Sequence, residues 1–190
     1  MTDQQSPFGC VNNTIRLRSG RYFDLAAPHP DQFEFSDIAG ALSKICRFGG
    51  QIESFYSVAE HSYHCWRIAY EDGCSKDVQL AVLLHDAAEA FIGDMVKPLK
   101  VMMPEYREVE ASVELAVAIK FNAKFGEHAA KIREIDHAML IAERRSLFSK
   151  DEVEWTGEKQ VRVVTPRIQR WRPESAEEYF SSAAWSLGVS

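Results

Sequence analysis

Cysteines with metal-binding or disulfide spacing are missing from this sequence of 190 residues. The four cysteines, Cys10, Cys46, Cys65 and Cys74, form no CxxC pair and follow no regular spacing. A zinc ribbon and a disulfide framework are therefore not expected. Reduced thiols in a cytoplasmic protein fit this pattern best.

Long apolar runs and an excess of positive charge are also missing. No stretch reaches the roughly 18 apolar residues of a membrane span, and the first residues, MTDQQSPFGC, lack the basic start and apolar stretch of a secretion signal. A formal net charge of −6 gives no field that would attract a long nucleic acid. We therefore expect no membrane partner and no long nucleic acid, although a local basic pocket could still hold a small phosphate ester.

The apolar content is sufficient for one domain. Hydrophobic residues make up 46% of the chain, which at this length can bury one sizeable core, so we interpret residues 1–190 as a single domain. Residues 14–25, TIRLRSGRYFDL, resemble a β-hairpin around a Ser-Gly turn. The rest is dominated by helical periodicity, and we predict an all-α fold with a small N-terminal hairpin.

Several helices can be placed from caps and periodicity. Ser57 and Glu60 fit a capping box at the start of a helix that carries His61 inward. The segment 76–91 is apolar almost all round and predicts a central helix. Further helices are expected over about 104–125, with Gly126 as the stop, over about 128–149, and at the C-terminus over about 175–187.

The most apolar predicted helix contains charged residues that need an explanation. In AVLLHDAAEAF, His85 and Asp86 are adjacent, and burial of such groups without partners would cost several kcal/mol. A bound cation would compensate them, and His61 and Asp136, each on the inner face of another helix, could complete its ligand set. Two imidazoles and two carboxylates suit one Mn²⁺, Co²⁺, Zn²⁺, Fe²⁺ or Ni²⁺ ion better than Mg²⁺.

These residues also carry a resemblance to a known family. SVAEHS, LLHDAAEAFIGD and the aspartate of REIDHAM resemble the H…HD…D signature of the HD-domain superfamily of metal-dependent phosphohydrolases. The sequence is most similar to the branch of bacterial deoxynucleoside 5′-monophosphatases and related phage nucleotide phosphohydrolases. The resemblance covers roughly residues 36–145 and implies an HD-type helical bundle with a nucleotide substrate.

The resemblance also implies roles for residues around the metal. Glu89 of HDxxE would orient or deprotonate the attacking water, and Asp94 would act as acid, base or positioning carboxylate. Arg47 of CRFGG would bind the phosphate.

Three further residues could contact the substrate. Lys97 and Lys100 in GDMVKPLK follow the acidic cluster and could reach the same phosphate. Phe48 could pack against a base.

Three functions remain open at this point. The first is a (deoxy)nucleoside 5′-monophosphatase, which needs few basic residues, and the second is a deoxynucleoside triphosphate triphosphohydrolase. The third is a non-catalytic nucleotide sensor. HD-type proteins that hold two metal ions need further histidines after the HD pair. Here only His128 lies between Asp86 and Asp136, so we expect one metal ion per chain rather than two. Members of the branch associate, so a homo-oligomer is expected.

Overall fold

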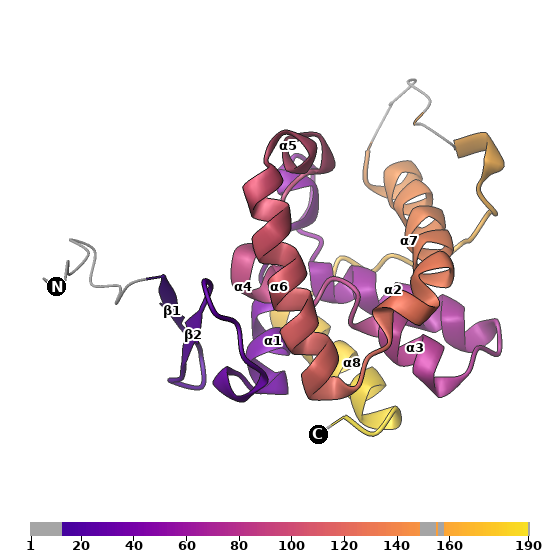
Figure 1. The fold of residues 1–190 in the computed structure, drawn as a ribbon. Coiled ribbons are helices and arrows are strands. Elements are labelled where there is room, and N and C mark those ends of the chain that lie inside the picture. Colours follow the sequence, from indigo (N-terminus) through magenta and orange to yellow (C-terminus); the bar gives the residue numbers. More distant parts are fainter. Residues whose placement is uncertain (1–12, 149–154, 156–157, 190) are drawn as a thin grey trace, which may run out of the picture.

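Helices dominate the computed structural model, which describes residues 13–148, 155 and 158–189 (Figure 1). A two-stranded antiparallel sheet lies near the N-terminus, so the predicted helical fold with a small hairpin is confirmed. In chain order the elements are β1 (Thr14–Arg16), β2 (Tyr22–Asp24), η1 (Pro30–Gln32), α1 (Phe35–Leu42), η2 (Arg47–Gly50), α2 (Val58–Glu71), α3 (Lys76–Leu83), α4 (Glu89–Ile92), α5 (Lys97–Met102), α6 (Pro104–Phe121), α7 (Phe125–Leu147), η3 (Glu158–Gln160) and α8 (Pro173–Ser186).

The hairpin is attached to the helices by its turn and by one aromatic ring. Its register pairs Ile15 with Phe23. Phe23 is fully buried and stacks on Phe91 of α4, with ring centroids 4.1 Å apart. In the turn, the backbone N–H and the hydroxyl of Ser19 both donate to the carboxylate of Asp37 on α1, each at 2.8 Å. The hairpin therefore covers one end of the core.

Helix α2 lies at the centre of the contacts that position the site. Its N-cap is Ser57, whose hydroxyl accepts the backbone N–H of Glu60 at 3.1 Å, as the cap pattern predicted. The helix packs against α3, α7 and α8. His61 and Cys65 lie one turn apart on its buried side. Side chains on this part of α2 are thus directed toward α3 and α7.

The predicted continuous helix over 76–91 is wrong. Helix α3 ends at Leu83, residues 84–88 form turns, and the short helix α4 begins at Glu89. Across this break the backbone bonds have i to i+3 spacing, as between the N–H of Glu89 and the carbonyl of Asp86 at 3.0 Å. His85 and Asp86 lie in the break rather than on a helix. Nothing in the apolar run, which has no Pro or Gly there, marks this change.

The predicted boundary between the two long helices is also wrong. Helix α6 ends at Phe121 because Asn122 adopts the left-handed conformation, with φ 52°, which Asn tolerates better than most residues. Gly126 lies inside α7 instead of stopping α6. The C-terminal helix predicted over 175–187 is confirmed as α8, which packs against α1, α2 and α3.

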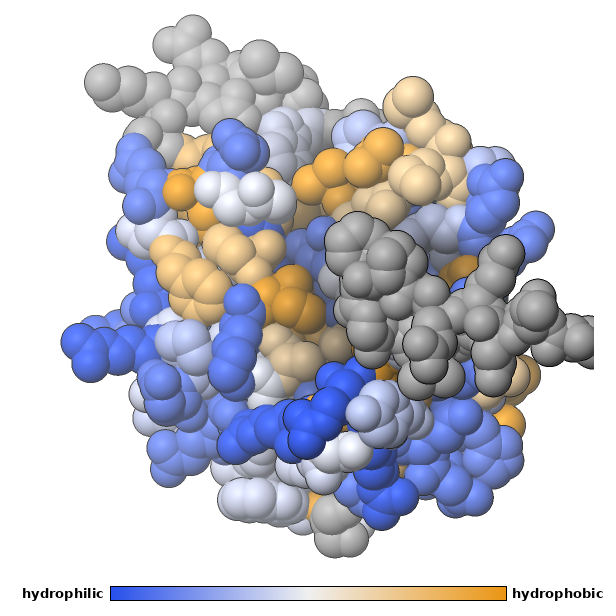
Figure 2. All heavy atoms as spheres, turned by 90° about the vertical axis from the view of Figure 1, so that its left-hand side faces the viewer, coloured by the Kyte–Doolittle hydropathy of each residue, from blue (hydrophilic) through white to orange (hydrophobic). Residues whose placement is uncertain are grey.

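The core has two parts, which both contact α2. One is rich in aromatic rings contributed by the hairpin, α1, α4 and α8, and the other lies among α2, α3 and α7. On the face that lies at the left of Figure 1, apolar side chains form separate groups among hydrophilic ones (Figure 2). On α5, Val101 and Met102 are 68% and 77% exposed. Among the helices that the structure describes, none is long and apolar enough to cross a membrane.

Candidate metal centre

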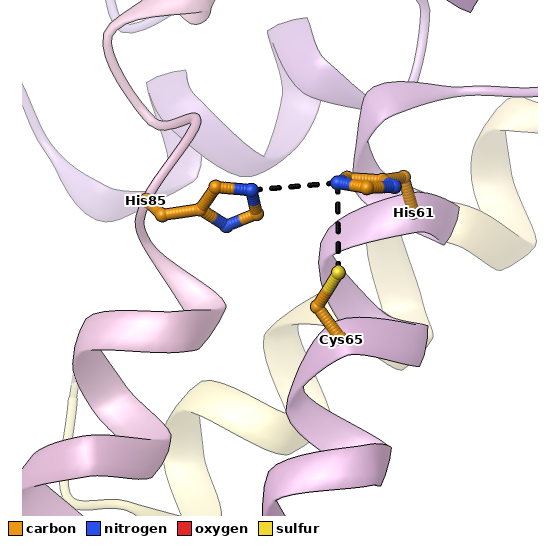
Figure 3. Close-up of side chains that lie close together, drawn as sticks. All are labelled: His61, Cys65 and His85. Atoms are coloured by element: carbon orange, nitrogen blue, oxygen red, sulfur yellow. Dashed lines mark hydrogen bonds between the residues drawn. The ribbon is translucent and has the colours of Figure 1, made fainter. Parts of the chain in front are cut away.

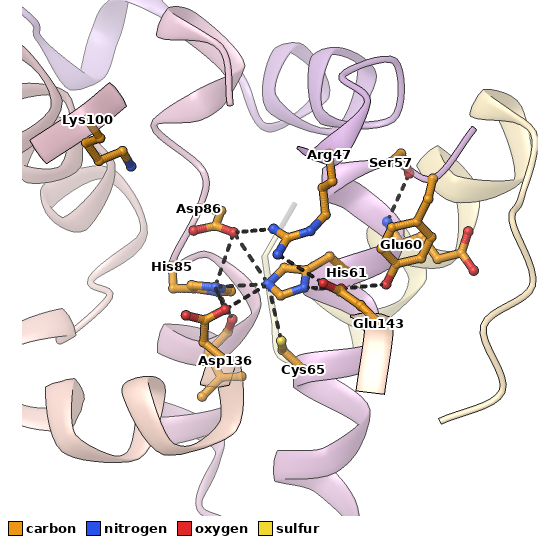
Figure 4. Close-up of polar contacts among 12 residues, drawn as sticks. Arg47, Ser57, Glu60, His61, Cys65, His85, Asp86, Lys100, Asp136 and Glu143 are labelled. Atoms are coloured by element: carbon orange, nitrogen blue, oxygen red, sulfur yellow. Dashed lines mark hydrogen bonds and ion pairs between the residues drawn. The ribbon is translucent and has the colours of Figure 1, made fainter. Parts of the chain in front are cut away.

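The four residues predicted as metal ligands meet at one point (Figure 4). His61 comes from α2, His85 and Asp86 from the turns between α3 and α4, and Asp136 from α7. The Nε2 atom of His61 lies 3.4 Å from His85 Nε2, 3.5 Å from Asp86 Oδ2 and 3.3 Å from Asp136 Oδ1. His85 Nε2 lies 3.3 Å from Asp86 Oδ2 and 3.9 Å from Asp136 Oδ1. The predicted ligand atoms thus surround a common space.

The spacing of these atoms fits a transition-metal ion. An ion that binds four ligands tetrahedrally at about 2.0–2.1 Å separates neighbouring ligand atoms by about 3.3–3.4 Å. Four of the five distances above lie within about 0.2 Å of this range. The side chain of His61 is fully buried, whereas that of Asp136 is 43% exposed. The site therefore has a closed imidazole side and an open carboxylate side.

Both imidazoles are held with Nε2 facing this space. His61 Nδ1 lies 2.6 Å from Glu143 Oε1, and His85 Nδ1 lies 2.8 Å from the carbonyl oxygen of Val82. Carboxylate and carbonyl oxygens only accept hydrogen bonds, so each Nδ1 carries a hydrogen. This is the arrangement in which a neighbouring oxygen orients a metal-binding histidine.

The charges of the site favour a cation. Burial and Arg47 oppose protonation of His61, but Cys65, Glu143 and Asp136 raise its pKa well above the ordinary value. Burial likewise opposes protonation of His85, yet Asp86 and Asp136 raise its pKa. Partial burial raises the pKa of Asp136, but hydrogen bonds from the two imidazoles outweigh it and hold this pKa well below its usual range. The carboxylates around the two imidazoles therefore favour a positive charge at this position, either a proton or a cation.

Glu143 of α7 is a functional candidate that the sequence analysis missed. Its side chain is fully buried, and besides His61 it accepts the hydroxyl of Tyr56 at 2.8 Å and pairs with Arg47 Nη2 at 3.1 Å. Burial raises its pKa, but Arg47 and His61 outweigh this and keep the pKa below the ordinary value. Glu143 follows Asp136 by seven residues, two helical turns, and this spacing could have identified it.

Arg47 lies beside the centre at the start of η2. Its Nη1 atom is 3.5 Å from Asp86 Oδ2, and it links this carboxylate to Glu143. Its Nε atom is buried without a hydrogen-bond partner in the described part of the chain. Burial disfavours the charge, but Glu143, Asp86 and Asp136 raise the pKa of Arg47, which stays a cation. The predicted phosphate-binding residue is thus close to the ligands, yet already engaged by two carboxylates.

Phe48 lies next to Arg47 with the unusual φ of 58° for a bulky residue. Its ring packs edge-on against Phe148 and Trp155, at centroid distances of 5.1 and 6.3 Å, and the Arg47 guanidinium lies 5.4 Å from its centroid. One part of the ring is therefore used for packing.

Cys65 is the second candidate that the sequence analysis missed. Its sulfur lies 3.5 Å from His61 Nε2, and the ligand atoms of His61, Cys65 and His85 all lie within 4.8 Å of one another (Figure 3). The thiol is fully buried, and burial raises its pKa to about 11, although His61 acts in the opposite direction. These three residues could hold a metal ion. The spacing of His61 and Cys65, one helical turn, was the available signal.

Glu89 at the start of α4 and Asp94 in the loop after it lie near Asp86, one of the predicted ligands. Burial, with the charges of Asp86 and Asp94, raises the pKa of Glu89 to about 10. Burial also raises the pKa of Asp94. Glu89 is 5% exposed, and its Oε2 atom has no hydrogen-bond partner among the described residues. This oxygen is therefore available to accept a hydrogen bond from water or from a substrate group.

The two lysines are placed differently. Lys97 begins α5 and is exposed. Lys100 is partly buried and pairs with Glu110 Oε1 at 2.6 Å. Burial opposes its charge, but Glu110, Glu89 and Asp86 raise its pKa. Lys100 thus feels the field of the site but is held by another carboxylate.

Two cavities of the molecule lie away from this centre. One, of about 560 Å³, is lined by α2 and residues 162–171, and the other, of about 640 Å³, by the N-terminal part of α1 and by α8. Neither is lined by any of the predicted metal ligands.

The comparison with known proteins found two curated bacterial relatives, and no family model matches the chain. One relative is the uncharacterized protein YfdR of Escherichia coli K12, which is 32% identical over 141 residues, covering 74% of this chain and 76% of YfdR. Another is the uncharacterized protein RCAP_rcc00048 of Rhodobacter capsulatus, 34% identical over 149 residues, covering 73% of this chain and 76% of that protein. Identity above 30% over most of both chains shows that this chain belongs to the same family as YfdR and RCAP_rcc00048.

Proposed function

We propose that this protein is a phosphohydrolase of the HD-domain type, which uses one divalent transition metal to remove phosphate from a nucleoside 5′-monophosphate. The observation that carries the proposal is the convergence of His61, His85, Asp86 and Asp136, with ligand atoms 3.3–3.9 Å apart. The H…HD…D order of these residues is the order of the family that the sequence resembles.

The residues of the chain divide into those that hold a metal and those that act around it. A divalent ion in such a site polarises a phosphoryl oxygen and makes water a nucleophile near neutral pH. Glu143 would keep His61 in the orientation and tautomer that a ligand needs, through its 2.6 Å contact with Nδ1. The exposed side of Asp136 leaves an approach for substrate.

Glu89 is the candidate for handling the water proton. With a pKa of about 10 it is neutral near pH 7, and a neutral carboxyl can donate a hydrogen bond but cannot take up a proton. The repulsion from Asp86 and Asp94 contributes to that pKa, so positive charge added beside these carboxylates would lower it. We therefore assign Glu89 the role of orienting the attacking water and, once ionised, of accepting its proton. Asp94 would assist in positioning or proton transfer.

Substrate size is argued from the cations near the centre. A triphosphate would need several free cationic side chains, whereas Arg47 and Lys100 are both paired with carboxylates. A single phosphate needs fewer partners, and Arg47 Nε is buried with no hydrogen-bond partner among the residues that the structure describes. These observations favour a monophosphate. We infer that Phe48 borders the position of the base, since its ring adjoins Arg47.

The proposal is tested by product analysis on a panel of dNMPs, NMPs, dNTPs and cyclic nucleotides with Mn²⁺, Co²⁺, Zn²⁺ or Mg²⁺. Asp86→Ala should abolish turnover, and the matched control Asp77→Ala, at an exposed position on α3, should retain it. Free phosphate with nucleoside from a monophosphate is the expected result. Release of triphosphate from a dNTP would establish a triphosphohydrolase instead, and binding of nucleotide without turnover would establish a sensor.

A further inference from the structure

One buried nucleophilic group beside the metal centre has no role in the proposed reaction. Cys65 is fully buried, and its sulfur faces the same nitrogen of His61 that faces His85 and the two aspartates (Figures 3 and 4). The sulfur–nitrogen distance of 3.5 Å is similar to the three other distances from this nitrogen, which are 3.3–3.5 Å. By distance alone, Cys65 belongs to the shell of His61 as much as Asp86 does.

The distance between the Cys65 sulfur and His61 Nε2 matches coordination of both atoms to one ion. With metal–nitrogen bonds of about 2.0–2.1 Å and a metal–sulfur bond of about 2.3 Å, tetrahedral geometry separates the nitrogen and sulfur atoms by about 3.6 Å. The observed 3.5 Å agrees with this value. Four candidate ligand atoms lie close to His61 Nε2, whereas in a tetrahedral site each ligand atom has only three neighbouring ligand atoms. The set therefore suits five protein ligands, or exchange of sulfur with one carboxylate.

Metal binding would also change what Cys65 can contact. When His61 Nε2 gives its lone pair to an ion, it can neither accept a hydrogen bond from the thiol nor donate one to the sulfur. The buried sulfur would then face a cation, and an S–H hydrogen directed at a cation is repelled, whereas a sulfur lone pair is attracted. Coordination by thiolate satisfies this geometry, because a metal ion can deprotonate a coordinating thiol outright.

We infer that Cys65 is a ligand of the metal at this centre and makes the centre selective for ions that accept sulfur. This inference rests on the proposed metal site. In the binding step the S–H bond breaks, a metal–sulfur bond forms and the proton leaves to solvent, with no change of oxidation state. Thiolate favours Zn²⁺, Co²⁺ and Fe²⁺ over Mn²⁺ and Mg²⁺. Cys65 is thus the residue that decides between these two groups of metals.

The test uses Co²⁺, because a cobalt–thiolate bond gives a charge-transfer absorption that nitrogen and oxygen ligands lack. The full chain is stripped with a chelator and titrated with Co²⁺ alone. We expect one equivalent to produce this absorption in the wild-type protein and in the control Cys74→Ser, whose thiol is half-buried between α2 and α3. Cys65→Ser should lack it. Loss of a residue that merely hydrogen-bonds to a metal ligand lowers metal affinity by about 10–100-fold, so the Zn²⁺ affinity of Cys65→Ser should fall by at least this much. Its Mn²⁺ affinity should change much less.

A second protein keeps the test decisive if Cys65→Ser does not fold. In this variant the other three cysteines are replaced by serine, so that thiolate absorption can come only from Cys65. Absorption that persists in it supports the inference. Stoichiometric Co²⁺ binding without thiolate absorption in the wild type overturns the inference and leaves the proposed site intact. Absence of Co²⁺, Zn²⁺ and Mn²⁺ binding would instead overturn the proposed metal site itself.

Discussion

Replacement of Glu143 by Gln tests whether the buried carboxylate organises the centre. The substitution keeps the shape of the side chain and removes its charge. Oε1 accepts from both Tyr56 and His61, while Oε2 pairs with Arg47 at 3.1 Å. If the amide oxygen keeps the first two partners, the amide NH₂ must face the guanidinium, so two donors meet and a buried cation loses one of its two carboxylates.

The magnitude follows from these contacts. Breaking a buried ion pair from one side costs about 3–5 kcal/mol, and the remaining contact of Arg47 with Asp86 places the expected loss near the lower end, about 3 kcal/mol. Metal affinity should fall by about 10–100-fold, because the oriented Nδ1–H of His61 loses its charged acceptor.

Two measurements check this prediction separately. Urea denaturation of metal-free protein gives the free energy of unfolding, and competition with a chelating indicator gives Zn²⁺ affinity. Glu178→Gln, at an exposed position on α8, is the control for the same change of charge. If Glu143→Gln matched the wild type in both measurements, the role assigned to Glu143 would be refuted.

Three further predictions concern protons and the C-terminal segment. Because the folded pKa of Glu89 is about 10 and the ordinary value is 4.5, folding of metal-free protein takes up a proton between these pH values, so stability should fall as pH rises across this window. Glu89→Gln should flatten this pH dependence and restore the about 3 kcal/mol of unfolding free energy that the raised pKa costs at pH 7. Urea denaturation at several pH values measures this, and an unchanged slope would refute the raised pKa of Glu89. The pKa values of His61 and His85 are raised, and both imidazoles must lose a proton to bind metal. Zn²⁺ affinity should therefore keep rising with pH above about 6.5, the ordinary value, and level off only beyond the raised pKa values. Isothermal titration that shows a constant affinity over this range would contradict the prediction. The carboxylate of Glu60 accepts hydrogen bonds from the backbone N–H groups of Gln169, Arg170 and Trp171 at 2.7–2.9 Å. Glu60→Gln should therefore lower the free energy of unfolding by about 1.5–3 kcal/mol and speed hydrogen exchange at these three amides. Unchanged exchange would be evidence against these contacts.

The capping box predicted for Ser57 and Glu60 is only half correct. Glu60 was interpreted as the partner in a capping box with Ser57. Ser57 does cap α2, but the carboxylate of Glu60 binds the backbone of residues 169–171 instead. Local spacing predicts the cap, whereas a contact across more than 100 residues depends on tertiary packing.

The convergence of the four proposed ligands was predictable because the residue types and their order carry the information. His61, His85, Asp86 and Asp136 are brought together although the helix expected to carry His85 and Asp86 is broken at Leu84. An apolar, alanine-containing run predicts helix by propensity, and the turns that direct these two side chains inward are set by their partners on α2 and α7. The hairpin was predictable from its Ser-Gly turn.

The supporting residues were harder to predict. Glu143 and Cys65 belong to no motif used in the sequence analysis, and helical spacing alone only places them on the same faces as Asp136 and His61. The contact of Glu143 with His61 further depends on the packing of α7 against α2. Arg47 was predicted to bind phosphate, but its two ion pairs could not be inferred from CRFGG alone. The sequence states which residues carry a charge, whereas the residue that pairs with each charge depends on the tertiary structure.

To learn whether one bound metal supports hydrolysis, metal is titrated into chelator-stripped protein while phosphate release from the preferred monophosphate is measured. We expect no turnover without metal, and a linear rise in turnover that stops at one equivalent of metal per chain. Asp136→Ala should show no such rise. Turnover that survives stripping, or that is equal in Asp136→Ala, would contradict the account.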